Sequence, residues 1–188
     1  MAWMTLEQIK AMGFAAVGQN VLLSDKASYY NCANIRIGNN VRVDDFCVLS
    51  AGTGGIVLGD YVHIAVYCLL IGAGRIEMAD FSGLSSRVSL YSSNDDYSGA
   101  TLTNPTVPKA FSGVVNADVS LGKHVIIGSG SIILPGVTLR EGAAVGALSL
   151  VTRDCESFSV YSGVPAKKIT QRKRDLLDLE NRLRSQSS

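Results

Sequence analysis

The sequence predicts an all-β solenoid, in which short strands wind into a column of stacked turns. Three observations lead to this fold class. Aliphatic residues recur every six positions over most of the chain, a small residue often follows the aliphatic one, and many of the 19 glycines fall into register with this repeat. A repeat of fixed period builds one structural unit again and again, and each unit buries its apolar face against the next.

The repeat is most regular towards the C-terminal end of the column. From Leu121 the chain reads LGKHVI, IGSGSI, ILPGVT, LREGAA, VGALSL and VTRDCE without a gap. Three such units make one turn of about 18 residues, with a short strand on each of three sides. Neighbouring turns then pair as parallel strands about 4.8 Å apart. The predicted turns begin near Val17, Ile37, Leu58, Met78, Leu121 and Leu139.

Both ends of the chain depart from the repeat. Residues 1–16 hold a short predicted helix and a lead-in, because Thr5 and Gln8 match a capping box. Residues 17–169 form the predicted solenoid domain, and residues 170–188 hold a second, amphipathic helix. The apolar positions of that helix are Leu176, Leu179 and Leu183.

One interruption breaks the repeat at about residues 91–117, which we expect to form a loop extruded from the solenoid. The stretch is polar and contains Pro105 and Pro108. Loops of this length that lack regular structure are often functional, so we expect this one to contribute to the site.

Charge and composition exclude several classes of protein. The formal net charge is +1, so no positive field favours a nucleic acid partner. No apolar run approaches the roughly 18 residues of a membrane span, and the N-terminus lacks the pattern of a signal peptide, so we expect a cytoplasmic protein. The chain has only two histidines, His63 and His124, which excludes a three-histidine metal site within one chain; we expect no metal.

The cysteines are widely spaced and lack any CxxC pair, which is typical of reduced thiols in a cytoplasmic protein. The Cys68 thiol could accept an acyl group. Its register matches that of Cys47 one turn earlier, however, so a buried structural role is favoured. The other two cysteines are Cys32 and Cys155.

The hexapeptide turns, the extruded loop and the closing segment YSGVPAKKI after VTRD resemble the hexapeptide-repeat acyltransferases. The similarity is to their galactoside and maltose acetyltransferase branch, which includes enzymes that modify sugars of surface polysaccharides, and it covers roughly residues 17–170. The resemblance implies a left-handed parallel β-helix and a homotrimer. It also implies acetyl-CoA as co-substrate, in the groove between adjacent columns.

The resemblance further implies a path for the coenzyme. Ser129 in IGSGS and Ala147 in VGALS lie one turn apart on the same side of the column, where small side chains leave room for a pantetheine arm. Thr152 and Arg153 in VTRD match the Thr-Lys pair of the family, and Lys167 in GVPAK matches a basic residue near the nucleotide phosphates.

The next basic position of the family falls on Thr170, which carries no charge. Lys168 or Arg172 would have to replace it, and Lys168 is included among the expected coenzyme-binding residues.

The expected catalytic position is where the chain departs from the family. Galactoside-type enzymes carry a histidine base early in the loop, whereas Asp95 occupies that position here and the loop has no histidine. A hydroxyl acceptor needs a base, and a carboxylate at its ordinary pKa near 4 is a weak one. An amine acceptor is less demanding, since its neutral form is already a nucleophile.

His63 is a candidate for the missing base, because we expect it at an outward-pointing corner of the column. In a trimer it could meet Asp95 or Asp96 of a neighbouring loop, and a histidine held by a carboxylate is an effective base. His124 is expected at another corner, exposed to solvent. A backbone N–H of a turn would stabilise the oxyanion.

These observations predict an acetyl-CoA-dependent enzyme that acetylates a sugar hydroxyl, in surface-polysaccharide (O-antigen or capsule) biosynthesis. One alternative is an N-acetyltransferase of a nucleotide-linked amino sugar, which is supported by the missing loop histidine. Another is a non-catalytic β-helix scaffold. The expected partners are therefore a sugar or nucleotide-sugar acceptor and two further copies of the chain.

Overall fold

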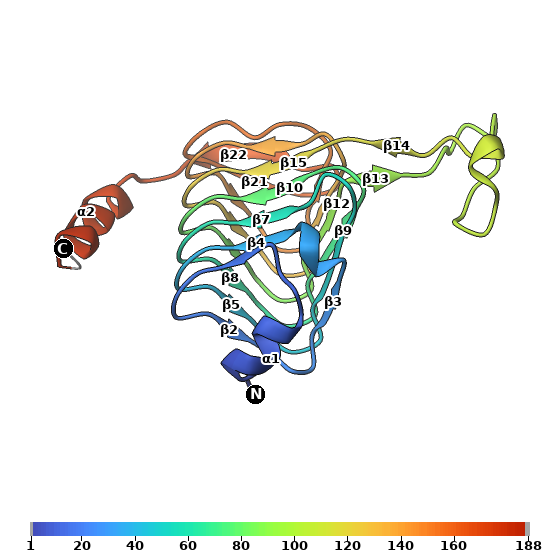
Figure 1. The fold of residues 1–188 in the computed structure, drawn as a ribbon. Coiled ribbons are helices and arrows are strands. Elements are labelled where there is room, and N and C mark those ends of the chain that lie inside the picture. Colours follow the sequence, from blue (N-terminus) through green and yellow to red (C-terminus); the bar gives the residue numbers. More distant parts are fainter. Residues whose placement is uncertain (1, 187–188) are drawn as a thin grey trace.

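The computed structural model describes residues 2–186, which wind into a three-sided column of stacked turns (Figure 1). The fold is the predicted left-handed parallel β-helix, and the strands on each side of the column pair in parallel, except for the last strand of the chain. We call these sheets the first, second and third walls, in the order in which the chain passes through them. Successive strands of one wall come from successive turns, so the strand order within each wall follows the sequence.

The first wall has six strands, and each of the residues at which a turn was expected to begin lies in one of them. Its strands in order are β1 (Ala16–Val17), β4 (Ile35–Ile37), β7 (Ile56–Leu58), β10 (Ile76–Met78), β15 (Val119–Leu121) and β18 (Thr138–Leu139).

The second wall has eight strands and carries most of the groups discussed below. Its strands in order are β2 (Leu22–Leu23), β5 (Arg42–Val43), β8 (His63–Ile64), β11 (Gly83–Leu84), β16 (Ile126–Ile127), β19 (Ala144–Val145), β21 (Ser159–Ser162) and β22 (Lys167–Gln171).

The third wall also has six strands, and the extruded loop leaves it. Its strands in order are β3 (Ser28–Tyr30), β6 (Val48–Ala51), β9 (Leu69–Gly72), β12 (Ser89–Tyr91), β17 (Ile132–Ile133) and β20 (Leu150–Val151). A short 3-10 helix, η1 (Cys32–Asn34), joins β3 to β4.

The core is a stack of aliphatic side chains, because one residue of each short strand points inward. In the second wall Val43, Ile64, Leu84 and Ile127 occupy equivalent places and are at most 1% exposed. All four cysteines are buried free thiols, and Cys47 and Cys68 lie in the core as their register predicts.

The corner between the first and second walls is turned by single residues in the left-handed conformation. The stacked residues at this corner, which we call the corner ladder, bring aromatic rings together one turn apart. The rings of Tyr61 and Phe81 stack with centroids 4.7 Å apart, and Phe81 stacks on His124 at 5.1 Å. The residues of the ladder with positive φ are Asn20, Asn40, Tyr61, Phe81, His124, Gly142 and Phe158.

Both ends of the column are covered. At the N-terminal end, α1 (Leu6–Ala11) begins with the predicted capping box of Thr5 and Gln8 and buries Ile9. At the C-terminal end, β22 adds an antiparallel strand to β21. The hexapeptide pattern does not predict this strand, because β22 reverses direction instead of starting another turn.

The C-terminal helix α2 (Leu176–Gln186) forms as predicted and lies beside the column (Figure 1). Its leucines are not part of the buried core, since Leu179 is 60% and Leu183 is 38% exposed. The buried residue is Glu180, which accepts hydrogen bonds from Lys123 at 2.7 Å and pairs with His124 Nε2 at 2.6 Å. The expectation that His124 is exposed is therefore wrong: it is 8% exposed because helix and aromatic stack enclose it.

The extruded loop projects sideways from the column (Figure 1). It begins as an antiparallel ribbon of β13 (Ser93–Asn94) and β14 (Val115–Asn116) and contains the 3-10 helix η2 (Lys109–Phe111). Several apolar side chains are exposed on it, among them Tyr97, Phe111 and Val115.

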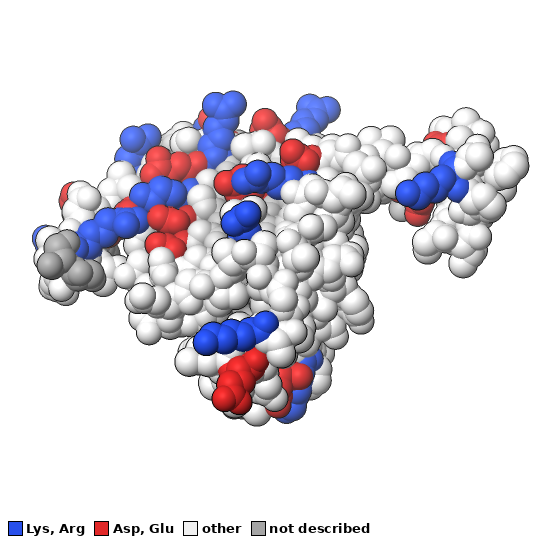
Figure 2. All heavy atoms as spheres, viewed as in Figure 1, with Lys and Arg blue, Asp and Glu red and all other residues white. Residues whose placement is uncertain are grey.

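Charged side chains are unevenly distributed on the face drawn in Figure 2. They gather over the C-terminal turns, along α2 and at the N-terminal end, while much of the column between them is uncharged. None of the helices within residues 2–186 is long and apolar enough to cross a membrane.

Candidate active site

The predicted coenzyme path runs along the corner between the second and third walls. Ser129 and Ala147 occupy equivalent places one turn apart, and both are exposed. Backbone hydrogen bonds hold this corner, since Leu148 N donates to Ser129 O at 2.9 Å and Gly130 N donates to Ser86 O at 3.0 Å. We call the line Ser86–Ser129–Ala147 the coenzyme track; it offers small side chains on a rigid backbone.

The predicted residues for the nucleotide end of the coenzyme lie in the C-terminal turns, with Thr152 and Arg153 at the corner between the third and first walls. Thr152 and Arg153 are exposed in the turn after β20, and Lys167 is exposed at the start of β22. Lys168 Nζ donates to Glu156 Oε2 at 2.6 Å, and this ion pair raises the pKa of Lys168.

Arg172 is used within the fold. Its Nη1 donates to the carbonyl oxygens of His124 at 2.7 Å and Gly142 at 3.0 Å. Of the two replacements considered for the family's basic position, Lys168 is the exposed one.

His63 lies at the start of β8 with its side chain half exposed, in the wall itself rather than at a corner. Its Nε2 is 3.0 Å from Asp44 Oδ2, and Arg42 Nε donates to Asp44 Oδ1 at 2.7 Å. Burial alone would raise the pKa of Asp44, but the hydrogen bonds from Arg42 and His63 outweigh it and lower that pKa. Asp44 is therefore a buried carboxylate that orients the imidazole.

The groove beside His63 measures about 270 Å³ and reaches the coenzyme track. Its lining combines the imidazole with two serine hydroxyls of the turn after β11 and one aliphatic side chain of β16. The lining residues are His63, Ala65, Gly83, Leu84, Ser85, Ser86, Ile126 and Ser129.

A second groove, of about 430 Å³, lies at the root of the extruded loop on the third wall. Asp95 lines it together with Tyr91, Tyr97, Ile132 and Leu150. The carboxylate of Asp95 thus lies beside aromatic and aliphatic surface.

Asp96 points into the loop rather than into this groove. Its carboxylate accepts hydrogen bonds from Ser98 N at 2.8 Å and from Thr101 N and Oγ1 at 2.9 and 3.0 Å. These hydrogen bonds, with that of Ser98 the strongest, lower the pKa of Asp96 to about 2.

Within one chain the structure does not bring His63 together with Asp95 or Asp96. His63 and Asp95 line separate grooves, one on each side of the corner that carries the coenzyme track. The carboxylate that holds His63 is Asp44, which the sequence reasoning missed. Arg42 pairs with His63 between neighbouring turns, and Asp44 lies two residues after Arg42. Aligning the repeats in register could therefore have shown that Asp44 lies near His63.

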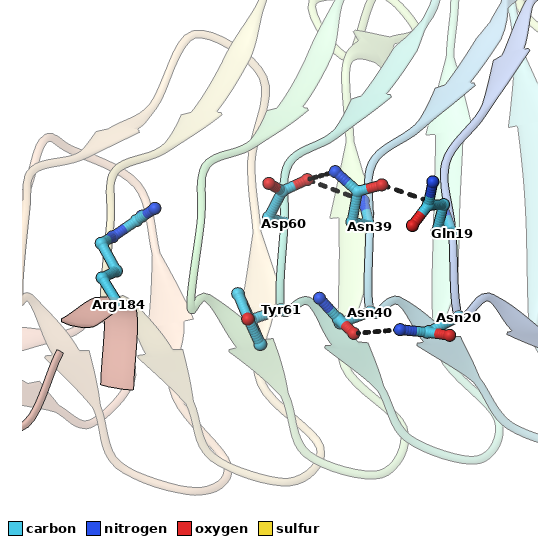
Figure 3. Close-up of a pocket in the computed structure, with 7 residues that line it drawn as sticks. All are labelled: Gln19, Asn20, Asn39, Asn40, Asp60, Tyr61 and Arg184. Atoms are coloured by element: carbon cyan, nitrogen blue, oxygen red, sulfur yellow. Dashed lines mark hydrogen bonds between the residues drawn. The ribbon is translucent and has the colours of Figure 1, made fainter. Parts of the chain in front are cut away.

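A further cavity, of about 580 Å³, lies along the corner ladder, and Arg184 of α2 lines one side of it (Figure 3). Its polar side chains already serve the fold. Asn39 N and Nδ2 both donate to Asp60 Oδ1, at 2.7 and 3.1 Å, and Asn20 Nδ2 donates to Asn40 Oδ1 at 3.1 Å. These groups link one turn to the next, whereas the predicted site residues line the two grooves beside the coenzyme track.

No cluster of three or more histidine, cysteine, aspartate or glutamate side chains that could hold a metal ion occurs within residues 2–186.

Comparison with known proteins agrees with this geometry. The chain is 57% identical to the dTDP-4-amino-4,6-dideoxy-D-glucose acyltransferase of Escherichia coli over 181 residues, which cover 96% of this chain and 94% of that protein. No protein-family model matches the chain.

Among solved structures, AntD, an N-acyltransferase from Bacillus cereus, superposes with a TM-score of 0.94 at 48% identity, covering 99% of this chain and 98% of that one. It was solved with dTDP and 3-hydroxybutyryl-CoA, and a serine variant was solved with dTDP-4-amino-4,6-dideoxyglucose and coenzyme A. A galactoside acetyltransferase in complex with coenzyme A shares the fold, with a TM-score of 0.59 at 21% identity over 89% of this chain and 70% of that one.

The left-handed β-helix and these relatives together show the class of protein, an acyltransferase that uses acetyl-CoA as co-substrate. The chain belongs to the hexapeptide-repeat acyltransferase family.

Proposed function

We propose that this protein transfers an acyl group from acetyl-CoA to the amino group of a nucleotide-linked amino sugar, with a dTDP-4-amino-4,6-dideoxyhexose as the acceptor. The observation that carries the proposal is the 57% identity, over 96% of the chain, to an enzyme named for that acceptor. The comparisons thus favour the N-acyl alternative over the hydroxyl acceptor that the sequence first predicted.

The chemistry of the site supports an amine acceptor. The loop position that holds a histidine in galactoside-type enzymes is occupied by Asp95, which is a weak base for a hydroxyl. A neutral amine attacks the thioester carbonyl directly, forming the C–N bond. The C–S bond then breaks, its electron pair stays on the coenzyme sulfur, and the amine proton must be removed by a group of the site.

In this proposal each predicted site residue has a part. The pantetheine arm lies along Ser129 and Ala147, while Thr152, Arg153 and the lysines of β22 face the nucleotide end of the coenzyme. His63 and Asp95 bracket the reacting atoms. Asp96 shapes the loop that presents Asp95. The lysines are Lys167 and Lys168.

A homotrimer is part of the proposal. The loop exposes Tyr97, Phe111 and Val115, and its groove is separated from the groove of His63 within one chain. Packing of that loop against a neighbouring column would cover the apolar side chains and join the two half-sites. Light scattering after size-exclusion chromatography tests this, because a stable monomer that is fully active would contradict it.

We place the enzyme in the cytoplasm, in the synthesis of surface polysaccharide. An acylated nucleotide sugar is ready for transfer to a growing glycan, and buried free thiols suit a reducing compartment.

The decisive experiment incubates the protein with acetyl-CoA and dTDP-4-amino-4,6-dideoxyglucose and follows release of the free thiol. We expect turnover, with an amide product by mass spectrometry, and no turnover of the 4-hydroxy analogue. Turnover of sugar hydroxyls but not of the amino sugar would overturn the proposal. Lack of thermal stabilisation by millimolar acetyl-CoA would instead point to the scaffold alternative.

An Asp95→Asn variant tests the loop carboxylate within the same assay. In this proposal the Asp95 carboxylate orients the acceptor amine, so we expect its loss to lower kcat by about tenfold or more, while the fold should be unchanged because Asp95 is at the surface of a loop groove. Asp25→Asn, an exposed aspartate near the N-terminal end of the column, is the matched control.

A further inference from the structure

The outward face of the second wall has a gap at Gly83. The outward positions of successive strands are Arg42, His63, Gly83 and Ile126, which pair in register from β5 to β16. Every one of these residues except Gly83 places a side chain on the face. The gap therefore opens a notch between His63 and Ile126, and this notch is part of the groove of about 270 Å³.

Gly83 is not required by the backbone or by close packing. A Cβ added there would meet nothing closer than His63 O at 3.8 Å and Ile126 Cδ1 at 4.0 Å, which are ordinary contacts. By contrast, a Cβ at Gly38 would lie 2.5 Å from Gly59 O, so that glycine is needed for turns to stack. The fold therefore does not require glycine at position 83, and the effect of the missing side chain is to leave the notch open.

The two sides of the notch differ in chemistry. On one side stands the imidazole of His63, which Asp44 holds through Nε2 at 3.0 Å. Because a carboxylate only accepts hydrogen bonds, Nε2 carries the hydrogen and Nδ1 is an acceptor in the neutral ring. On the other side is the aliphatic side chain of Ile126, which is 45% exposed.

The notch also adjoins the lower end of the coenzyme track. Ser86 and Ser129, the first two members of the track, both line it. A pantetheine arm that descends the track from Ala147 would bring its thioester to this level of the column.

We propose that the notch at Gly83 receives the reacting end of the acceptor sugar, with its 6-methyl group against Ile126 and its 4-amino group facing His63. In this arrangement His63 Nδ1 takes the proton from the attacking amine and passes it to the sulfur of the leaving coenzyme. Asp44 is a positioning residue that fixes the tautomer and the ring orientation. The inference rests on the proposed N-acyl transfer and adds where the acceptor lies.

Filling the notch is the direct test. Gly83→Val places a branched side chain between His63 and Ile126, in a strand where branched residues are well tolerated. We expect kcat/KM for the amino sugar to fall at least about 10-fold while the affinity for coenzyme A changes less than about twofold. Gly83→Ala adds only the Cβ that fits and should show a smaller loss. Arg36→Val, at an exposed outward position of the first wall, is the control.

The role of Asp44 is tested by Asp44→Asn alongside His63→Gln. If Asp44 acts through His63, Asp44→Asn lowers kcat with little change in the KM of the acceptor, and combining it with His63→Gln adds little further loss. A glutamate at position 44 should restore part of kcat. Losses that simply add in the double variant would contradict the positioning role, provided that thermal unfolding shows each variant to be folded.

The wild-type enzyme separates failure of this inference from failure of the proposed function. If it acylates the amino sugar and a folded Gly83→Val variant keeps wild-type kcat/KM, the notch is not the acceptor site. If the wild-type enzyme acylates only another acceptor, the proposed function fails. The assignment of the notch then stands if Gly83→Val impairs that acceptor, and falls if it does not.

Discussion

At the scale of single residues, the role that we propose for the small side chains of the coenzyme track depends on their size. Ser129 and Ala147 are exposed on a rigid corner, so enlarging them does not disturb the core. What changes is the space above the backbone, where the coenzyme is expected.

We predict that Ala147→Leu weakens binding of coenzyme A by at least about tenfold, because the added side chain occupies the place of the pantetheine arm. Isothermal titration calorimetry measures this directly. Arg36→Leu puts the same side chain on the first wall and should bind like the wild type. Equal affinities for wild type and Ala147→Leu would show that the coenzyme lies elsewhere.

The carboxylate of Asp96 stabilises the loop in which it lies. Its three hydrogen bonds to Ser98 and Thr101 hold the first part of the loop together. We predict that Asp96→Ala loosens the loop and speeds tryptic cleavage after Lys109, which is exposed. Asp95→Asn should leave the rate of cleavage unchanged, since Asp95 lines the groove rather than these turns. Unaltered cleavage in Asp96→Ala would contradict the local role.

At the scale of elements, the glycines of the repeat are of two kinds. Some allow neighbouring turns to stack closely, and others leave open space on the outer face of a wall. We predict that Gly38→Ala destabilises the protein by roughly 1–3 kcal/mol, because its Cβ would lie 2.5 Å from the backbone of the next turn. The same substitution at Gly83 meets only ordinary contacts and should leave stability nearly unchanged. Thermal unfolding of the two variants makes the comparison, and equal melting temperatures would refute it.

Charged groups hold helix α2 to the column at Glu180. Burial would raise the pKa of Glu180, but hydrogen bonds from Lys123, Arg184 and His124 outweigh it and lower that pKa from 4.5 to about 2. A lowered carboxylate pKa means that the folded form prefers the ionised group. Its stabilisation is therefore complete above the ordinary pKa and is lost as the pH falls from about 4.5 towards 2.

We accordingly predict that Glu180→Gln costs on the order of 2 kcal/mol at neutral pH and much less near pH 2. Thermal unfolding of both proteins across this range measures the difference. A penalty that is the same at pH 7 and at pH 2.5 would show that the charge of Glu180 does not hold the helix. Leu179→Ala, on the exposed side of α2, is the control for loss of helix surface.

At the scale of the whole molecule, the repeating turns could be predicted from the sequence. Contacts between segments far apart in the chain could not. The period placed the turn starts, the walls and the outward face of Ser129 and Ala147, because each turn sees only its neighbours. The contact of Glu180 with His124 joins residues from the end and the middle of the chain, and no local pattern encodes it.

The candidate site follows the same division. The resemblance led to His63 and Asp95, but not to the separation of their grooves or to Asp44 as the partner of His63. Strand pairing puts Arg42 beside His63, so stacking the repeats in register would have brought Asp44 close. The shape of the loop, by contrast, depends on turns such as that around Asp96, which the repeat does not govern.

The order of strands in the second wall sets the distance between the notch and the lysines of β22. From β11, with its notch, the wall continues through β16 and β19 to β21 and β22, each about 4.8 Å from the last. The span available to the coenzyme is thus counted in turns. A turn duplicated before β5 would lengthen the protein and leave His63 beside its partner Asp44, whereas one inserted between β16 and β19 would move the lysines of β22 about 4.8 Å further from the notch. With the site as proposed, the column can therefore gain turns at its N-terminal end without separating the groups that take part.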